Sequence, residues 1–173
     1  FRDMEHFLKV SEAPLFSLVP DASFPCCNGE KGILTGSFVS EPLESTLVSF
    51  KGGQVHNMVP DAAEAVLAGI TLEQAQNAVG DMLKVEEAEN GIRFTAKGTA
   101  CHAADPFNAV SAVERLASGL LKSGLVSGKT ARILQFIADI QSDFQGTKAG
   151  VAADDKISTP LTLVVGVAKT VEG

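Results

Sequence analysis

The chain has 173 residues, of which 45% are hydrophobic and 20% are charged, and its formal net charge at pH 7 is −7. This composition excludes a disordered tail, because the apolar content suffices for a buried core. The acidic balance, without any Lys/Arg cluster, argues against a nucleic-acid partner, and no apolar run approaches the roughly 20 residues of a membrane span.

The amino-terminal sequence and the cysteine content both predict a cytoplasmic protein. The opening FRDMEHFLKV lacks the apolar stretch and the cleavage site of a secretory signal. Cys26, Cys27 and Cys101 form an odd set with one adjacent pair, which is a poor disulfide framework. A metal site built from these thiols and His102 is disfavoured because no C-x-x-C spacing is present, and small buried thiols are the simpler interpretation.

The first third of the chain predicts a helix, a long connection and a run of strands. Residues 1–13 favour a short helix, and the opening without Met indicates a domain excised from a longer protein. Prolines and glycines make 14–32 a loop-rich connection. The composition of ILTGSFV (33–39) and STLVSFK (45–51) is typical of strands. DAAEAVLAG (61–69) is interpreted as a strand, although its alanines also favour a helix.

A helix and a hairpin are predicted next. Thr71 followed by Gln74 is a capping-box signature, and the apolar residues behind it recur at helical spacing, which predicts a helix over 72–84. Asn90-Gly91 then separates two strand candidates and favours a hairpin with a type I′ turn. In its second strand, apolar residues alternate with polar ones, as expected for a sheet with one buried face.

The last part of the chain predicts two helices and a strand. Asp105 as N-cap and Pro106 at the first helical position predict a helix over 106–123. A further helix over 129–142 and a strand over 161–171 follow. The element order from residue 61 onward is that of a ferredoxin-like α+β sandwich, with an antiparallel sheet and helices on one face.

Four stretches, in order along the chain, resemble one family of enzymes. VPDASFPCCNGEKGI (19–33) is similar to the PD-x-x-FP…EKG signature of PepV-like zinc dipeptidases, which share a metallopeptidase clan with aminoacylases, desuccinylases and glutamate carboxypeptidases. GGQVHNMVPDAAEAVL (52–67) resembles the GG-x-x-x-NMVP motif of that family. GTACHAADPFNAVSA (98–112) resembles its G-x-x-x-H-x-x-x-P-x-x-x-NA motif, and TPLTLVVGV (159–167) its G-x-LT-x-N-x-G motif.

The resemblance implies a lid domain with a small part of a catalytic domain attached. Residues 1–32 would be the edge of the catalytic zinc domain and its connection, and 33–173 a lid or dimerisation-type domain truncated before its last strands. Asp21 would be a ligand of one of two zinc ions. His102 and Asn57 would reach into the catalytic cleft and hold the carbonyl oxygen of the scissile peptide bond of a dipeptide or short peptide.

The other zinc-site residues of that family are absent from the matching stretches of this sequence. The resemblance requires a His-x-Asp pair, a Glu-Glu pair, a distant His and a later lid Arg; none of these occurs in the four stretches that match the family, and Glu86-Glu87 lies outside them. We therefore expect the chain alone to hold little or no zinc and to need the missing catalytic domain of the same protein for hydrolysis. Since this domain mediates dimerisation elsewhere in the clan, a homodimer is a further expectation.

The residue types suit these roles, although each has a simpler alternative. An imidazole N–H and a carboxamide N–H are suitable donors to an oxyanion, and a carboxylate suits a metal ion. Without the resemblance, His102 reads as a turn histidine bonded to local backbone, and Asn57 and Asp21 as turn residues.

The preferred hypothesis is the lid domain of a zinc dipeptidase. A non-catalytic ferredoxin-like interaction domain is the alternative. A small-molecule regulatory domain would have the same topology but would not explain the PDASFP…EKG sequence.

Overall fold

The computed structural model describes residues 2–16, 29–43 and 46–171, and the chain divides into two compact units, Phe1–Gly32 and Ile33–Gly173. In the first unit, α1 (Arg2–Val10) confirms the short helix expected near the amino terminus. Acidic residues lie in its first turn and Lys9 in its last, an order that complements the helix dipole. The assignment of residues 1–32 to a catalytic domain stays a prediction.

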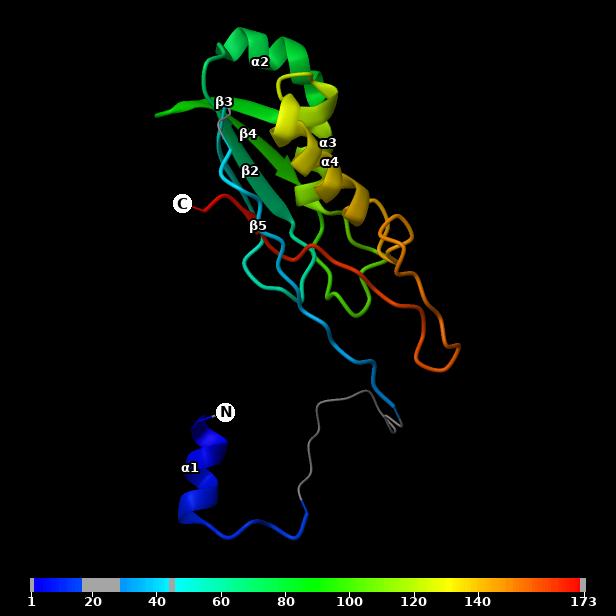
Figure 1. The fold of residues 1–173 in the computed structure, drawn as a ribbon. Coiled ribbons are helices and arrows are strands. Elements are labelled where there is room, and N and C mark those ends of the chain that lie inside the picture. The colour runs from blue at the N-terminus through cyan, green and yellow to red at the C-terminus, as the bar shows by residue number, and fades with distance from the viewer. Residues whose placement is uncertain (1, 17–28, 44–45, 172–173) are drawn as a thin grey trace. The chain divides into compact units, whose positions relative to one another are not determined.

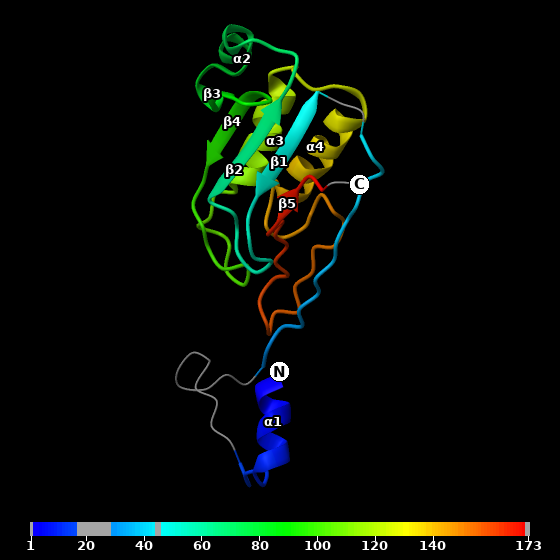
Figure 2. The ribbon, with the colours of Figure 1, turned by 90° about the vertical axis from the view of Figure 1, so that its left-hand side faces the viewer.

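The second unit is built on an antiparallel sheet (Figure 1), and its strand order is β3-β4-β2-β1-β5 (Figure 2). Five strands form this sheet within the described residues: β1 (Leu47–Gly52), β2 (Ala62–Leu67), β3 (Lys84–Ala88), β4 (Gly91–Lys97) and β5 (Ala168–Lys169). The ambiguous alanine-rich segment is therefore a strand, β2. The sheet and its helices confirm the predicted ferredoxin-like α+β class.

The helices of this unit lie on one face of the sheet (Figure 2). Helix α3 (Ala112–Lys122) packs on β2 and β4, α4 (Gly128–Gln141) packs on α3, and α2 (Leu72–Val79) contacts β3 and α3. The opposite sheet face is charged: Arg93 forms ion pairs with Glu86 at 3.4 Å and with Glu64 at 3.8 Å. None of the helices in the described ranges is long and apolar enough to cross a membrane.

The core lies between the sheet and α3, and alternate residues of β4 are buried in it. In β4 the buried residues are Ile92, Phe94 and Ala96, as the alternation predicted. The largest fully buried side chains of the unit include Phe94, Leu67, Leu116, Leu120 and Leu134. Strand and helix periodicity therefore place the same set of apolar side chains in one core.

Helix α2 begins with the capping box that the sequence predicts. The backbone N–H of Gln74 donates to the Thr71 hydroxyl at 3.2 Å, and the Thr71 N–H donates to the Gln74 side-chain oxygen at 2.9 Å. The α-helix ends at Val79 and a 3-10 turn, η1 (Gly80–Met82), completes the predicted helical segment.

The predicted start of the next helix, at Pro106, is wrong. Helix α3 begins at Ala112, and its N-cap is Ser111, whose hydroxyl accepts a hydrogen bond from the Glu114 N–H. The preceding residues are held in a loop because Thr99 and Val110 exchange backbone hydrogen bonds of 2.8 and 3.0 Å. Asp105 is therefore a turn residue and not a helix cap.

The predicted hairpin is present, but its turn is not type I′. The two turn residues are Glu89 and Asn90, and neither has the positive φ that a type I′ turn requires. Gly91 instead begins β4 with a φ of 143°, and a Cβ there would collide with the Leu67 carbonyl. Glycine is needed at this position for close strand packing.

Two predicted strands are wrong or much shorter than expected. Residues 33–39 form no strand, and of the segment 161–171 only Ala168 and Lys169 pair with β1. The strand at the end of the chain is short because the N–H groups that precede it have other partners. The Leu163 N–H donates to the Phe144 carbonyl at 2.8 Å, and the Val165 N–H donates to the Gln141 side chain.

Phe94→Ala should destabilise the chain severely, because Phe94 is fully buried on β4, an interior strand of the sheet. We expect a loss of about 3–5 kcal/mol in the free energy of unfolding, measured by urea denaturation. Phe107→Ala, at a half-exposed phenylalanine, is the matched control and should cost less than about 1 kcal/mol. Equal losses in the two variants would contradict the assigned core.

Candidate functional site

Two of the motif segments, 52–67 and 98–112, lie side by side at one end of the sheet. The Val59 N–H donates to the Cys101 carbonyl at 2.9 Å, and the Ala103 N–H donates to the Asn57 carbonyl at 2.8 Å. Met58 and His102 form the antiparallel bridge between these bonds. Segments remote in sequence are thus paired through their backbones where the predicted site residues lie.

The same segments are anchored to the core on the side next to the sheet. The Gly98 N–H donates to the Asp61 carbonyl at 2.7 Å, and the Ala112 N–H donates to the Pro60 carbonyl at 2.9 Å. Pro60 is itself buried. Because Ala112 is the first residue of α3, the helix start fixes both loops, which gives the site a rigid base.

A third motif segment, 159–167, reaches the same place through Gly166. A Cβ on Gly166 would collide with the backbone of His56, and a Cβ on Gly53 would collide with the Gly166 carbonyl. Gly53 also has a φ of 77°, a region that favours glycine. The glycines of two motifs therefore permit close backbone packing beneath the site, a role that sequence reasoning missed although both glycines were within the quoted motifs.

Asn57 and His102 are brought together. The Asn57 Nδ2 atom lies 3.4 Å from His102 Nε2, although the residues are 45 positions apart in sequence, and both side chains are exposed. The Ala104 N–H donates to His102 Nδ1 at 3.2 Å. This acceptor role of Nδ1 places the proton of a neutral imidazole on Nε2, so Nε2 is a donor.

The arrangement places two N–H donors close together, with their nitrogen atoms 3.4 Å apart. Two donors cannot bond to each other, but an oxygen atom placed between Nε2–H and Nδ2–H can accept from both. Without such an acceptor, rotation of the Asn57 amide lets its oxygen accept from His102 instead. The pair is therefore suited to binding a carbonyl oxygen or an oxyanion.

Among the other residues considered for a metal site, only Cys101 is part of the chain that the structure describes. Asp21, Cys26 and Cys27 lie outside the described residues. Cys101 is a partly buried free thiol. Across 2–16, 29–43 and 46–171, no three His, Cys, Asp or Glu side chains come close enough to hold a metal ion. The described residues alone therefore do not fit a zinc site.

Carboxyl groups with lowered pKa values belong to turns and surface ion pairs and not to this site. Hydrogen bonds from the Ser158 hydroxyl and from the backbone N–H groups of Ser158 and Ile157 lower the pKa of Asp155 to about 2. Hydrogen bonding to Lys148 lowers the pKa of Asp139, and hydrogen bonding to Lys84 lowers that of Glu86. The hydrogen bonds and ion pairs that cause these pKa shifts stabilise local structure, and the shifts indicate no further reactive group.

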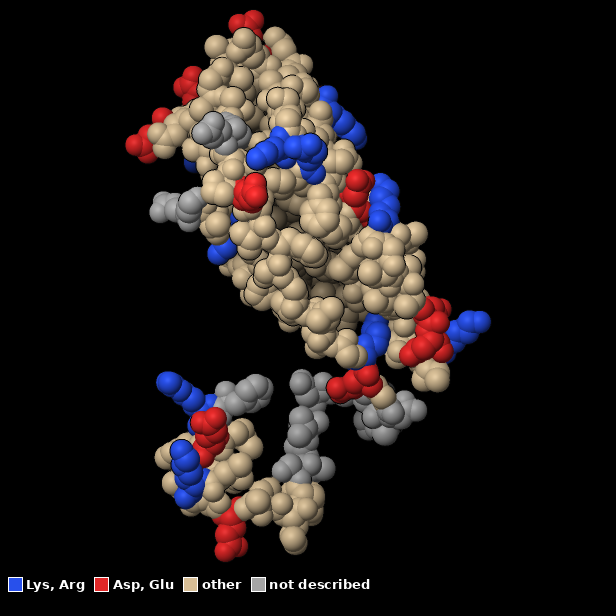
Figure 3. All heavy atoms as spheres, viewed as in Figure 1, with Lys and Arg blue, Asp and Glu red and all other residues tan. Residues whose placement is uncertain are grey.

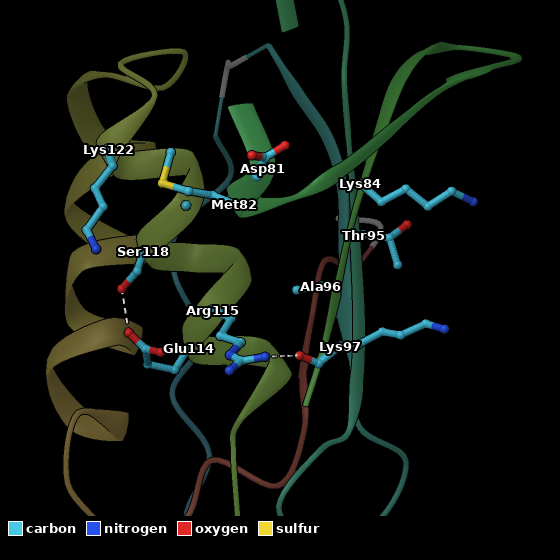
Figure 4. A pocket seen from close by; sticks show the side chains of 11 residues that line it. Asp81, Met82, Lys84, Thr95, Ala96, Lys97, Glu114, Arg115, Ser118 and Lys122 are labelled. Carbon is cyan, nitrogen blue, oxygen red and sulfur yellow. Dashed lines mark hydrogen bonds between the residues drawn. The ribbon is translucent and has the colours of Figure 1, made fainter. Parts of the chain in front are cut away.

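A larger hollow lies elsewhere, between α3 and the ends of β3 and β4 (Figure 4). Its volume is about 520 Å³ and it is open to solvent. The Arg115 guanidinium donates to the Lys97 carbonyl at 2.9 Å, and the Ser118 hydroxyl donates to Glu114. Because these polar groups already satisfy one another, and because Asn57 and His102 do not line it, the hollow is a weaker candidate than the Asn57–His102 pair.

Comparison with known proteins relates the chain to dipeptidases. No protein-family model matches it. It is 37% identical over 189 residues to "Putative dipeptidase YtjP" of Bacillus subtilis (strain 168), covering 100% of this chain and 40% of that protein. It is 31% identical over 183 residues to "Putative dipeptidase MW1694" of Staphylococcus aureus (strain MW2), covering 94% of this chain and 38% of that protein. The chain is thus homologous to a segment of proteins named as dipeptidases, which are peptide hydrolases, and spans about two fifths of their length.

His102→Ala should leave the free energy of unfolding of the chain within about 0.5 kcal/mol of its original value, because the side chain is exposed and water can replace its bond to Ala104. Urea denaturation is the measurement. A loss above about 1.5 kcal/mol would show that His102 is a structural turn residue.

Gly166→Ala should destabilise the same chain by about 1–3 kcal/mol, because the added methyl group meets the His56 backbone, which cannot move as a side chain can. The same denaturation assay measures this change. A neutral effect would contradict the close packing described beneath the site.

Proposed function

We propose that this chain is the lid and substrate-binding domain of a longer zinc dipeptidase of the PepV-like type. In this proposal residues 1–32 belong to the edge of the catalytic domain, and His102 and Asn57 bind the carbonyl oxygen of the scissile bond. The observation that carries the proposal is the position of these two side chains. The resemblance selects these two residues from separate motifs. Their side-chain nitrogen atoms lie 3.4 Å apart on two exposed loops that are paired through their backbones.

The chemical reason is the charge that develops during peptide hydrolysis. Attack of water converts the planar carbonyl group into a tetrahedral intermediate whose oxygen is negatively charged. Donors that are already oriented toward this oxygen stabilise it, by about 3–4 kcal/mol each in comparable sites. The imidazole Nε2–H and the carboxamide Nδ2–H would both donate to this oxygen. The backbone at His102 and Asn57 would not have to move for them to do so.

The remaining chemistry would come from a metal site completed mainly by parts of the protein outside this chain. The proposed pair of zinc ions would polarise the carbonyl group and activate water, with Asp21 as one ligand. The described residues contain no metal cluster, so we assign to them only the binding and orientation of the substrate and the stabilisation of its oxyanion. Short peptides with a free amino terminus are the proposed substrates.

In the full-length protein, His102→Ala should lower kcat for dipeptide hydrolysis by about a hundredfold, because the lost hydrogen bond is made chiefly in the transition state. Asn57→Ala should also lower kcat, and the double variant should lose less than the product of the two single losses because both donors bind one oxygen. His56→Ala is the matched control: it removes an exposed neighbouring histidine and should leave kcat unchanged.

Steady-state kinetics and zinc content should be measured on the same preparations. An unchanged kcat in His102→Ala would refute the oxyanion role and favour a non-catalytic interaction domain. A loss of zinc in that variant would instead make His102 a metal ligand.

A further inference from the structure

The segment 33–39 exposes several large apolar side chains to solvent. Ile33 and Leu34 are 94% and 97% exposed, and Phe38 and Val39 are each 82% exposed. Isolated exposed apolar residues are ordinary, but residues 33–39 contain four of them in two adjacent pairs, and this segment is called the apolar strip below. Uncharged side chains also cover much of the molecular face shown in Figure 3.

The sequence of this strip is typical of a buried strand. Residues 32–40, GILTGSFVS, contain no charged residue and no proline. Free sheet edges are normally protected by charges or prolines, and uncharged strand-forming segments without such protection tend to aggregate. The strip therefore has the composition of a strand that is covered in the complete protein.

Within its own unit the strip contacts α4 near its carboxyl-terminal end. The Phe38 ring packs edge-on against Phe136 of α4, with ring centroids 5.4 Å apart, and Glu41 pairs with Lys129 of the same helix at 3.8 Å. Residues 33–43 take part in no strand of the described sheet. The contacts with α4 thus fix the far end of the strip and leave its apolar side chains exposed.

We infer that residues 33–39 form a β-strand that pairs with the sheet of the domain outside this chain and is buried there. The inference rests on the proposed function in one respect, that the chain is part of a longer protein. The relatives are more than twice as long as the chain, which covers 38–40% of them. The strip also begins at Ile33, which directly follows Gly32, the last residue of the first compact unit, and residues 1–32 are the part that the proposed function assigns to the catalytic domain.

Hydrogen exchange on the full-length protein tests the pairing. Amides of 33–39 should exchange at least a hundredfold more slowly than those of the exposed loop 147–152, because strand hydrogen bonds protect them. Exchange at the rate of that loop would overturn the inference. Protection should not change on hundredfold dilution; protection that disappears on dilution would show that a second copy covers the strip, which would also overturn it.

A pair of variants tests the burial independently. Leu34 and Ile157 are 97% and 90% exposed in this structure, so exposure here predicts no difference between them. In the full-length protein, Leu34→Asp should lower Tm by about 5 °C or more, whereas Ile157→Asp should not change it. Equal Tm values would overturn the inference. Neither assay reads catalysis, so failure here is distinguishable from failure of the role proposed for His102.

Discussion

Two backbone hydrogen bonds between separate loops hold the candidate site together. The Val59 N–H bonds to Cys101 and the Ala103 N–H bonds to Asn57, which sets the loops in antiparallel register. The Asn57 and His102 side chains are exposed, so packing against the core does not position them. The backbone pairing keeps their nitrogen atoms adjacent while both groups remain available to a substrate oxygen.

The core serves the site by fixing the two ends of this pairing. Pro60 is buried and accepts a hydrogen bond from Ala112, the first residue of α3. That helix packs on the central strands around Phe94, so the loop positions depend on the best-buried part of the unit. Close backbone packing at Gly166 supports the loop from a third segment. A site mounted in this way can stay oriented while its binding groups stay in solvent.

The sequence predicted those features that depend on local patterns. Strand alternation identified the buried face of β4, and the Thr71 capping box located the start of α2. The predicted start of α3 was wrong because pairing between Thr99 and Val110 outweighs the local helix signal at Asp105. The strand expected at 33–39 is absent, and these residues pair with none of the strands that the structure describes.

The contact between Asn57 and His102 could not be derived from their spacing, since 45 residues separate them. Only the resemblance to the dipeptidase family suggested a common site. The tautomer of His102 was equally inaccessible, because it depends on the Ala104 N–H, a backbone group that any residue at that position except proline would supply. Long-range pairing and backbone donors are properties of the fold, and sequence patterns do not encode them directly.

The most direct test of the central claim is the tautomer of His102, measured by nitrogen-15 NMR of the imidazole ring at a pH where the ring is neutral. The hydrogen bond from Ala104 predicts a proton on Nε2 and an unprotonated Nδ1. His56, exposed nearby, serves as the reference ring in the same spectrum. A proton on Nδ1 of His102 would leave Nε2 as an acceptor, unable to donate to an oxyanion, and would contradict the account.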